Sequence, residues 1–328
     1  MSFNEVIDQE SAVKILKEEL KSERINHAYL FCGKEGIGKK TLAFEFTKSL
    51  MCQEIDFDNC NTCITCKKIE HHNHPDVKFI KTEEDSNQIK IDQIRELQKE
   101  ITLRPYETER KIYIIDEADK MNPAAANCLL KTLEEPPDYA VIILLAEKKD
   151  HLLPTIISRC QQLQLSNISQ KEIRKYLQKK DLEEDKLRLY SLLAEGSLGK
   201  ALELVNNSDF LNKRKELLEI LARLPGLDRV DIFDYAGQLA NTFDNSTQLF
   251  NLISGWYRDI ILYTGGNKET ILNYDFLNSI EKQSQEYNIQ QLLDIIKLIN
   301  KYENYVERNV RKKLTLQVLM IKIRSKRV

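Results

Sequence analysis

The sequence is poor in turn-forming residues and has no long apolar run. It contains 10 glycines and 7 prolines among 328 residues, whereas these two residue types typically make up roughly 12% of a chain. This composition favours helices and argues against a β-sandwich, a β-barrel or a collagen-like rod. The longest uninterrupted apolar stretch, Tyr139 to Ala146, is far shorter than the roughly 20 residues that cross a bilayer. We therefore expect no membrane contact.

Neither sign of charge dominates the chain. The 49 Lys and Arg residues nearly balance the 51 Asp and Glu residues, which leaves a formal net charge of −2. The first twenty residues carry acids where a signal peptide has a basic start and an apolar run. We predict a cytoplasmic protein that is neither a general polyanion binder nor an acidic solvating chain.

The first half of the chain alternates short apolar runs with amphipathic segments. The apolar runs predict strands, and the amphipathic segments predict helices. Strands are predicted at Ala28–Cys32, Val77–Ile80, Lys111–Ile115, Val141–Ala146 and Gln161–Leu165, and helices at Lys39–Met51, Ile91–Leu103 and Pro123–Glu134. This alternation predicts an α/β domain with a mainly parallel sheet covered on both faces.

After about residue 166 the strand signals disappear. Short helices are predicted at Ser169–Lys179, Asp185–Ala194 and Ser197–Val205, and longer ones at Leu211–Leu224, Asp231–Phe243, Gln248–Tyr263, Ile289–Glu307 and Val310–Ile323. We predict three domains: an α/β domain at 1–166 with an insertion near 52–66, a three-helix domain at 167–207, and an all-helical domain at 208–328.

A glycine-rich loop connects the first predicted strand to the helix that follows it. The loop contains Gly33, Gly36, Gly38, Lys39, Lys40 and Thr41. This is the P-loop arrangement, in which backbone N–H groups and a helix N-terminus surround phosphate and a lysine reaches its outer oxygens. A dinucleotide-binding turn would read G-x-G-x-x-G, whereas this loop reads G-x-x-G-x-G. An ordinary glycine-rich turn is the alternative.

The loop departs from the strict pattern at Lys40. That position normally holds Ser or Thr, whose hydroxyl binds Mg²⁺, and here the first hydroxyl comes one residue later, at Thr41. A cation beside the magnesium position removes a ligand and adds repulsion. We therefore expect that nucleotide could still bind but that hydrolysis would suffer.

The third predicted strand ends in acidic residues. Asp116 and Glu117 follow Lys111–Ile115 directly. In an NTPase, Asp116 would hold the metal and Glu117 would polarise the attacking water. Acids at the end of a buried strand are often without chemistry, but a phosphate loop on another strand makes that interpretation less favourable.

Four cysteines fall within the predicted insertion, at Cys52, Cys60, Cys63 and Cys66. Four thiolates are the number that a closed, structural Zn²⁺ site needs. An iron–sulfur cluster and free thiols are the alternatives, but bacterial cluster motifs continue to a further Cys followed by Pro, and Cys66 is followed by two lysines. His71, His72 and His74 could replace one ligand, although we expect them at the surface.

A longer set of motifs resembles a known family. The matching strings are His27–Phe31 before the loop, the four cysteines, His74–Asp76, Arg104–Tyr106, Asp116–Asn122, Ala126–Pro137, Ser158–Cys160 and, more weakly, Trp256–Asp259. With these strings the chain resembles the delta-prime family of bacterial DNA polymerase III clamp-loader subunits, which are AAA+ proteins. The resemblance covers nearly the whole chain. It implies a P-loop α/β core, a three-helix lid and an all-helical C-terminal collar domain.

The resemblance also implies roles for particular residues. Arg159 would act as an arginine finger in the ATP site of a neighbouring subunit. ATP-hydrolysing members carry a small polar residue after the fourth strand and an arginine in the lid. Here Glu147 follows that strand, and the lid string Gly196–Lys200 has glycine at position 199. With Lys40, these departures imply a degenerate ATP site, so that bound ATP and Mg²⁺ are doubtful.

The implied partners are motor ATPase subunits and delta in a hetero-pentamer. Through that complex the chain would act on a sliding clamp and on primed DNA. Two other functions remain open: an active AAA+ ATPase, such as the motor subunit itself, and a zinc-dependent nucleic-acid-binding protein. Residues 308–328 carry eight Lys or Arg and no acid. This stretch predicts either phosphate contact or the solvated face of a helix.

Overall fold

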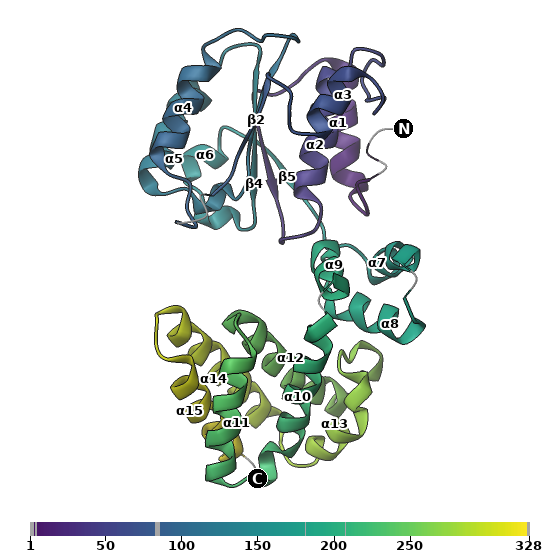
Figure 1. The fold of residues 1–328 in the computed structure, drawn as a ribbon, viewed down its shortest axis with the longest axis vertical. Coiled ribbons are helices and arrows are strands. Elements are labelled where there is room, and N and C mark those ends of the chain that lie inside the picture. Colours follow the sequence, from purple (N-terminus) through teal and green to yellow (C-terminus); the bar gives the residue numbers. More distant parts are fainter. Residues whose placement is uncertain (1–2, 4, 83–85, 181, 207, 327–328) are drawn as a thin grey trace. The chain divides into compact units, whose positions relative to one another are not determined.

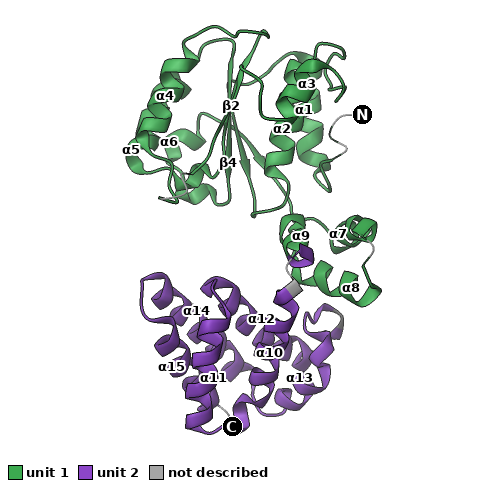
Figure 2. Ribbon diagram, in the orientation of Figure 1, with its two compact units in different colours: residues 1–203 green, residues 204–328 purple. Residues whose placement is uncertain are grey.

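The computed structural model describes residues 3, 5–82, 86–180, 182–206 and 208–326. It divides into two compact units, Met1–Glu203 and Leu204–Val328 (Figure 2). The first unit contains the α/β core and the helices predicted for the lid, except for residues 204–206 at the end of the third of these helices. The finer division into an α/β domain at 1–166 and a lid at 167–207 stays a prediction.

A five-stranded parallel sheet forms the centre of the first unit (Figure 1). The strands are β1 (Ala28–Cys32), β2 (Val77–Ile80), β3 (Lys111–Ile115), β4 (Ala140–Ala146) and β5 (Gln161–Gln164), in the order β2-β3-β4-β1-β5. All five strands were predicted, and β4 and β5 each differ from the prediction by one residue at one end. Since β1 lies between β4 and the edge strand β5, the loop after β1 opens at the sheet's carboxyl edge, one strand in from β5.

Helices cover both faces of this sheet, as the alternation of the sequence predicted. One face carries α1 (Glu10–Ser22), α2 (Lys39–Met51) and α3 (Ile64–Glu70), and the other carries α4 (Ile91–Ile101), α5 (Pro123–Glu134) and α6 (Pro154–Ile157) (Figure 1). Residues alternate between the two faces: Tyr113 and Ile115 of β3 join the apolar cluster under α4 and α5, whereas Ile112 and Ile114 join the cluster under α1 and α2. The sequence prediction had placed no helix at α1, α3 or α6.

Three helices follow the sheet, and the boundary between the two units falls near the end of the third. They are α7 (Gln170–Leu177), α8 (Glu184–Leu193) and α9 (Leu198–Asn206). The Ser169 hydroxyl caps α7 by accepting a hydrogen bond from the Glu172 amide. Each helix lies within three residues of its predicted bounds. We call α7–α9 the lid helices below.

The C-terminal unit is entirely helical in its described residues. Its α-helices are α10 (Ser208–Arg223), α11 (Arg229–Thr242), α12 (Ser246–Thr264), α13 (Leu277–Ser284), α14 (Ile289–Glu307) and α15 (Lys312–Arg324). Trp256 is fully buried in the core, and its indole N–H donates to Gln283 Oε1 at 3.0 Å. The buried Arg214 pairs with Asp275 at 2.7 Å. The prediction found every one of these helices except α13.

The structure also bears on the membrane and on the basic C-terminal stretch. Among the described residues, no helix is both long enough and apolar enough to span a membrane. The basic stretch at 308–328 forms α15 and its flanks, with Leu316, Leu319 and Ile323 buried. Residues 327 and 328 lie outside the described part of the chain.

Candidate functional site

The glycine-rich loop lies between β1 and α2. Gly36 and Gly38 have φ angles of +72° and +101°, a region of conformational space that favours glycine. Gly38 is the N-cap of α2, which begins at Lys39. The unpaired N–H groups of this helix N-terminus therefore face the loop, and such an arrangement is suited to an anion.

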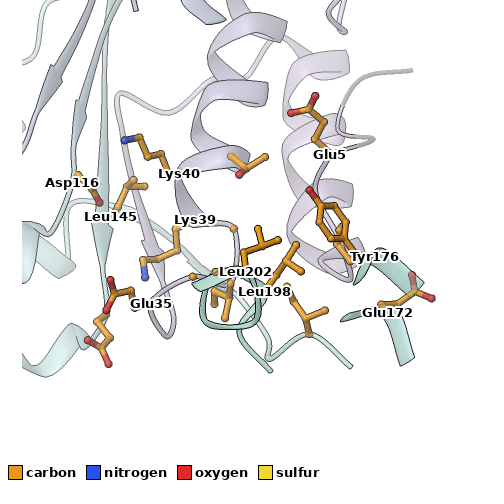
Figure 3. Close-up of a pocket in the computed structure, with 18 of the residues that line it drawn as sticks. Glu5, Glu35, Lys39, Lys40, Asp116, Leu145, Glu172, Tyr176, Leu198 and Leu202 are labelled. Carbon is orange, nitrogen blue, oxygen red and sulfur yellow. The ribbon is translucent and has the colours of Figure 1, made fainter. Parts of the chain in front are cut away.

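A pocket of about 850 Å³ opens at this loop (Figure 3). Several parts of the first unit form it: the loop and α2, the residues that follow β3, the end of β4 with Glu147, the N-terminal segment at Glu5 and Ile7, and the lid helices α7 and α9. It brings together Gly36, Gly38, Lys39, Lys40, Thr41, Asp116 and Glu117, which are all of the predicted nucleotide-site residues except Gly33. Its other side includes apolar side chains at Ile168, Tyr176, Leu198 and Leu202. The sequence analysis did not predict this apolar side.

Lys39 folds back onto its own loop. Its ammonium donates to the carbonyl oxygens of Gly33 at 2.6 Å and Lys34 at 2.9 Å. Burial lowers the pKa of Lys39, and nearby carboxylates, Glu147 and Asp116 foremost, oppose that shift. Lys39 thus stabilises the loop by its two hydrogen bonds and lies close to the carboxylates of Glu147 and Asp116.

Lys40 extends away from Lys39 at the start of α2 (Figure 3). Its ammonium lies 4.2 Å from the centre of the Phe79 ring on β2, within range of a cation–π contact. Burial raises the pKa of Asp116, and the positive charge of Lys40 is the strongest influence in the opposite direction. A fixed side-chain cation therefore acts on the carboxylate that would hold a metal in an active NTPase.

Glu117 has both carboxylate oxygens engaged. Oε1 pairs with Lys120, and Oε2 accepts a hydrogen bond from the Thr82 hydroxyl at 2.7 Å. Burial alone would raise the pKa of Glu117, but these bonds outweigh it and leave the pKa below its usual value. The Glu117 carboxylate is thus ionised, and both of its oxygens already contact protein groups. Lys120, three residues along, was a partner that spacing could have suggested, whereas Thr82 is brought close only by the sheet.

The lid helices touch the phosphate loop through two glycines. The Gly199 amide, at the start of α9, donates to the Gly36 carbonyl at 2.8 Å. A Cβ atom at position 199 would lie only 2.7 Å from Gly36 Cα. The residue at 199 must therefore lack a side chain in this arrangement, and an arginine would not fit there.

Arg159 is placed away from the pocket, just after α6. Its Nη1 donates to the Thr155 carbonyl at 3.0 Å, and its Nη2 lies 2.8 Å from Glu134 Oε1. The side chain is about one-third exposed, at 35%. Arg159 is not among the described residues that line the pocket. The guanidinium is therefore engaged by Thr155 and Glu134 and is not part of the described lining of the chain's own pocket.

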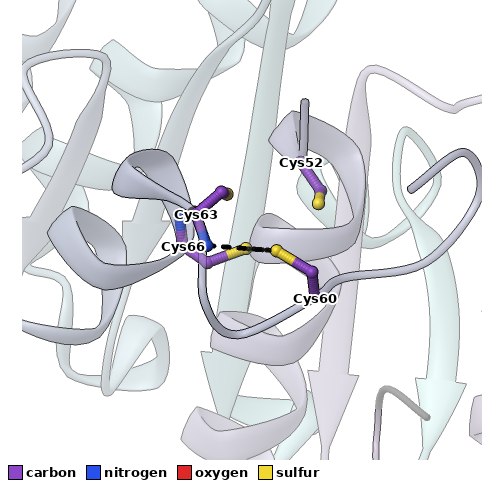
Figure 4. A group of neighbouring side chains, drawn as sticks. All are labelled: Cys52, Cys60, Cys63 and Cys66. Atoms are coloured by element: carbon purple, nitrogen blue, oxygen red, sulfur yellow. Dashed lines mark hydrogen bonds between the residues drawn. The ribbon is translucent and has the colours of Figure 1, made fainter. Parts of the chain in front are cut away.

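The four predicted cysteine ligands converge. The sulfur atoms of Cys52, Cys60, Cys63 and Cys66 all lie within 4.8 Å of one another (Figure 4). Four thiolates around one Zn²⁺ at about 2.3 Å would be roughly 3.8 Å apart, so a small contraction of the group would fit the ion. Hydrogen bonds from Thr62 and Cys63 lower the pKa of Cys60 to about 6, whereas burial raises the pKa of Cys66. The thiolate that a metal requires is thus favoured at Cys60 and opposed at Cys66 while no ion is bound.

Buried polar contacts link α2 to the cysteine loop, the segment between Cys52 and Cys66. Lys48, itself paired with buried Glu45, donates to Asn61 Oδ1 at 2.5 Å. Asn59 donates to Glu45 Oε2 at 3.1 Å and to Ser49 Oγ at 3.3 Å. The sequence analysis missed this network because charged residues within a helix are usually exposed.

The histidines after the cysteine loop lie outside the group of ligands that converge there. His71 and His72 are exposed, as expected. The expectation that His74 lies at the surface was wrong, since it is only 3% exposed. Its Nδ1 accepts a hydrogen bond from the Asp76 amide at 3.1 Å, and burial lowers its pKa. His74 therefore stabilises the turn before β2 by accepting this hydrogen bond.

A glycine-rich loop that leads from a strand of a parallel sheet into a helix N-terminus, with a pocket over it, defines the class of P-loop α/β proteins. The solved structure of a DNA polymerase III gamma subunit-related protein from Thermotoga maritima has a similar fold. Its TM-score is 0.55 at 20% identity, over 97% of this chain and 99% of that one.

Sequence relatives narrow the class to one family. A model of the DNA polymerase III delta subunit matches residues 8–169, and a model of the delta subunit's C-terminal part matches 208–325. The delta' subunit of Bacillus subtilis DNA polymerase III is 32% identical over 92% of both chains. The tau subunit of the same organism is 29% identical over 98% of this chain, which spans 61% of tau. The chain belongs to the delta-prime family of bacterial DNA polymerase III clamp-loader subunits.

Proposed function

We propose that this chain is a non-motor subunit of a replicative clamp loader. It would assemble with motor ATPase subunits and delta into a hetero-pentamer that places a sliding clamp on primed DNA. Its match with delta' over nearly the full length of both chains supports this role. In this proposal the C-terminal helices, residues 208–328, form its part of the collar.

The chain's own pocket would not hydrolyse ATP. One observation carries this part of the proposal: Lys40 occupies the position of the magnesium-binding hydroxyl, and its charge acts directly on Asp116. Two further features agree with it. Glu117 is held by Lys120 and Thr82, and position 199 has no room for an arginine. A water-activating carboxylate and a charge-stabilising donor are both needed for fast phosphoryl transfer.

Arg159 would act in the ATP site of the neighbouring subunit. Its partly exposed guanidinium and its separation from the chain's own pocket support this assignment. A guanidinium offers a fixed positive charge and several donors to a phosphoryl group that gathers charge as it is transferred.

Cys52, Cys60, Cys63 and Cys66 would hold a structural Zn²⁺. The ion would supply a rigid cross-link between the end of α2 and the start of α3, because a site closed by four protein ligands has no open position for catalysis. The network of Glu45, Lys48 and Asn59 would keep the ligand loop in place.

An active motor ATPase is the second candidate. The observation that favours it is the pocket itself, where Lys39, Thr41 and Asp116 line a space of about 850 Å³. In that case the Thr41 hydroxyl would replace the usual magnesium ligand.

ATP turnover distinguishes the two candidates. We expect the isolated chain to show no turnover above background, and a loader reconstituted with its cognate subunits to lose at least about tenfold in ATPase rate when the chain carries Arg159→Ala. Arg24→Ala, at an exposed arginine between α1 and β1, is the matched control. DNA-stimulated turnover of several per second by the isolated chain would establish the motor instead, and an unchanged rate with Arg159→Ala would exclude the role in trans.

A further inference from the structure

The backbone around Arg159 is fastened on both sides. Ser158 donates its hydroxyl proton to the Thr155 carbonyl at 3.1 Å, and the Arg159 amide donates to the Ile156 carbonyl at 3.1 Å. The next residue, Cys160, is buried in the apolar cluster under α5 and α6. Arg159 is therefore a partly exposed residue in a turn whose backbone is held by its neighbours.

The guanidinium is held by two further contacts. Nη1 reaches the Thr155 carbonyl, and Nη2 reaches Glu134 Oε1 at 2.8 Å. These contacts use two of the five N–H donors of a guanidinium. Glu134 is the last residue of α5, and Pro136 and Pro137 follow one residue later. The carboxylate thus extends from the end of a helix that cannot continue.

We infer that Glu134 is a positioning residue for Arg159, an inference that rests on the proposed role of Arg159 in a neighbouring ATP site. Between partly exposed groups such an ion pair adds little to folding stability. The ion pair instead orients the Arg159 side chain. An arginine has many rotamers, and acceptors at two different nitrogens select one of them. The remaining donors are then presented together.

A fixed conformation of Arg159 would affect ATP hydrolysis in the neighbouring subunit. There a water oxygen bonds to the γ-phosphorus while the bond from that phosphorus to the β–γ bridging oxygen breaks, which yields ADP, inorganic phosphate and a proton. A donor already in place costs no reorganisation as charge builds up on the transferred group.

Glu134 could instead act as a counter-ion that competes with the partner's phosphates for Arg159. The two roles predict opposite signs. Removing a competitor would speed up the partner's turnover, whereas removing a positioning group would slow it. The Thr155 carbonyl favours positioning, because it holds the other nitrogen of the same guanidinium without carrying a charge.

The test is the ATPase rate of the reconstituted loader with this chain as wild type, Glu134→Ala, Glu134→Gln or Arg159→Ala. We expect Glu134→Ala to lower kcat about two- to fivefold, the factor that corresponds to an exposed anchor of up to ~1 kcal/mol, with KM for ATP unchanged. Glu134→Gln keeps an acceptor oxygen and should retain most of the rate. Glu135→Ala removes the same charge one residue along the chain, and should behave as wild type.

The outcomes separate the two proposals. If Arg159→Ala abolishes stimulation while Glu134→Ala leaves kcat unchanged or raises it, the positioning role is wrong and the role of Arg159 stands. If Glu134→Gln is as slow as Glu134→Ala, the acceptor oxygen is not what matters, and the inference also fails. If Arg159→Ala has no effect, the proposed function itself fails. Thermal melting and co-purification of each variant with the other subunits show that a slower rate does not come from misfolding or lost assembly.

Discussion

At position 199 the lack of a side chain decides where a helix lies. The amide of Gly199 reaches the phosphate loop only because both residues in contact are glycines. We expect Gly199→Ala to cost about 1–3 kcal/mol, since its Cβ would overlap Gly36 and the backbone must move. Hydrogen exchange of α9 amides should accelerate in this variant.

Gly255→Ala is the matched control for Gly199→Ala. A Cβ at Gly255, within α12, would meet nothing within 4 Å. Replacement of a glycine in an open helix position should stabilise the chain by about 0.5–1 kcal/mol. If Gly199→Ala exchanges and melts like wild type, the contact between the glycines does not hold α9.

At the same scale, the sequence shows which residues are present but not always what they contact. Lys40 and Gly199 could be identified as departures by position alone. The partners of Glu117 and Arg159 could not all be identified, because Thr82 and Glu134 are distant in sequence and meet them only once the strands have paired. His74 was misjudged for a related reason: a histidine in a polar stretch carries no sign of burial.

Among the elements, the connection from α4 to β3 depends on one carboxylate. Asp76 is 1% exposed and accepts hydrogen bonds from the amides of Tyr106, Glu107 and Thr108 at 2.6, 2.8 and 3.1 Å. Burial alone would raise its pKa, but these bonds bring it below the usual value. The motifs His74–Asp76 and Arg104–Tyr106, noted separately in the sequence, are therefore two halves of one structure.

The pKa of Asp76 predicts how stability depends on pH. Because the folded pKa lies below the unfolded one of about 3.9, the carboxylate stabilises the fold above about pH 4, and this contribution is lost as the pH falls through the folded pKa. At pH 6, Asp76→Asn should lower the free energy of unfolding by about 2–3 kcal/mol, measured by urea titration. The deficit should shrink in more acidic solution. Asp92→Asn, at an 83% exposed carboxylate, should show little effect at either pH, and a deficit at Asp76 that does not depend on pH would contradict the assignment.

Long periodic elements were the easiest to predict. The strands and the helices with several apolar residues on one face were found within a few residues of their ends. α6 and α3 were missed because they have only 4 and 7 residues, too few to show a period. α1 should have been found, since Ala12, Leu16 and Leu20 recur every four residues and are buried.

Across the whole molecule, the strand order was beyond what the sequence alone could provide. Alternation predicts a parallel sheet, but only the paired backbones show that β1 lies between β4 and β5. That placement puts the phosphate loop near Asp116 and the lid helices. The three-domain division remains a prediction, alongside the two compact units of the structure.

The single tryptophan can show whether the loss of the metal site destabilises only the first unit or the C-terminal unit as well. Trp256 is buried in the C-terminal unit, whereas the cysteines belong to the first unit. In Cys60→Ser/Cys63→Ser, elemental analysis should find the loss of one zinc per chain, and the circular-dichroism transition of the first unit should fall by roughly 6–12 °C for a loss of ~3 kcal/mol. The fluorescence transition of Trp256 should stay in place. Cys128→Ser, outside the cluster, is the control, and a variant with full zinc content would exclude this ligand set.

The contact between Gly36 and Gly199 also has an evolutionary consequence. A codon change that gave position 199 an arginine would push α9 off the loop before the new side chain could reach a nucleotide. In the proposed role without ATP hydrolysis, a lineage with this packing would not gain a lid arginine by one substitution, because that first step would lose the contact between the two glycines.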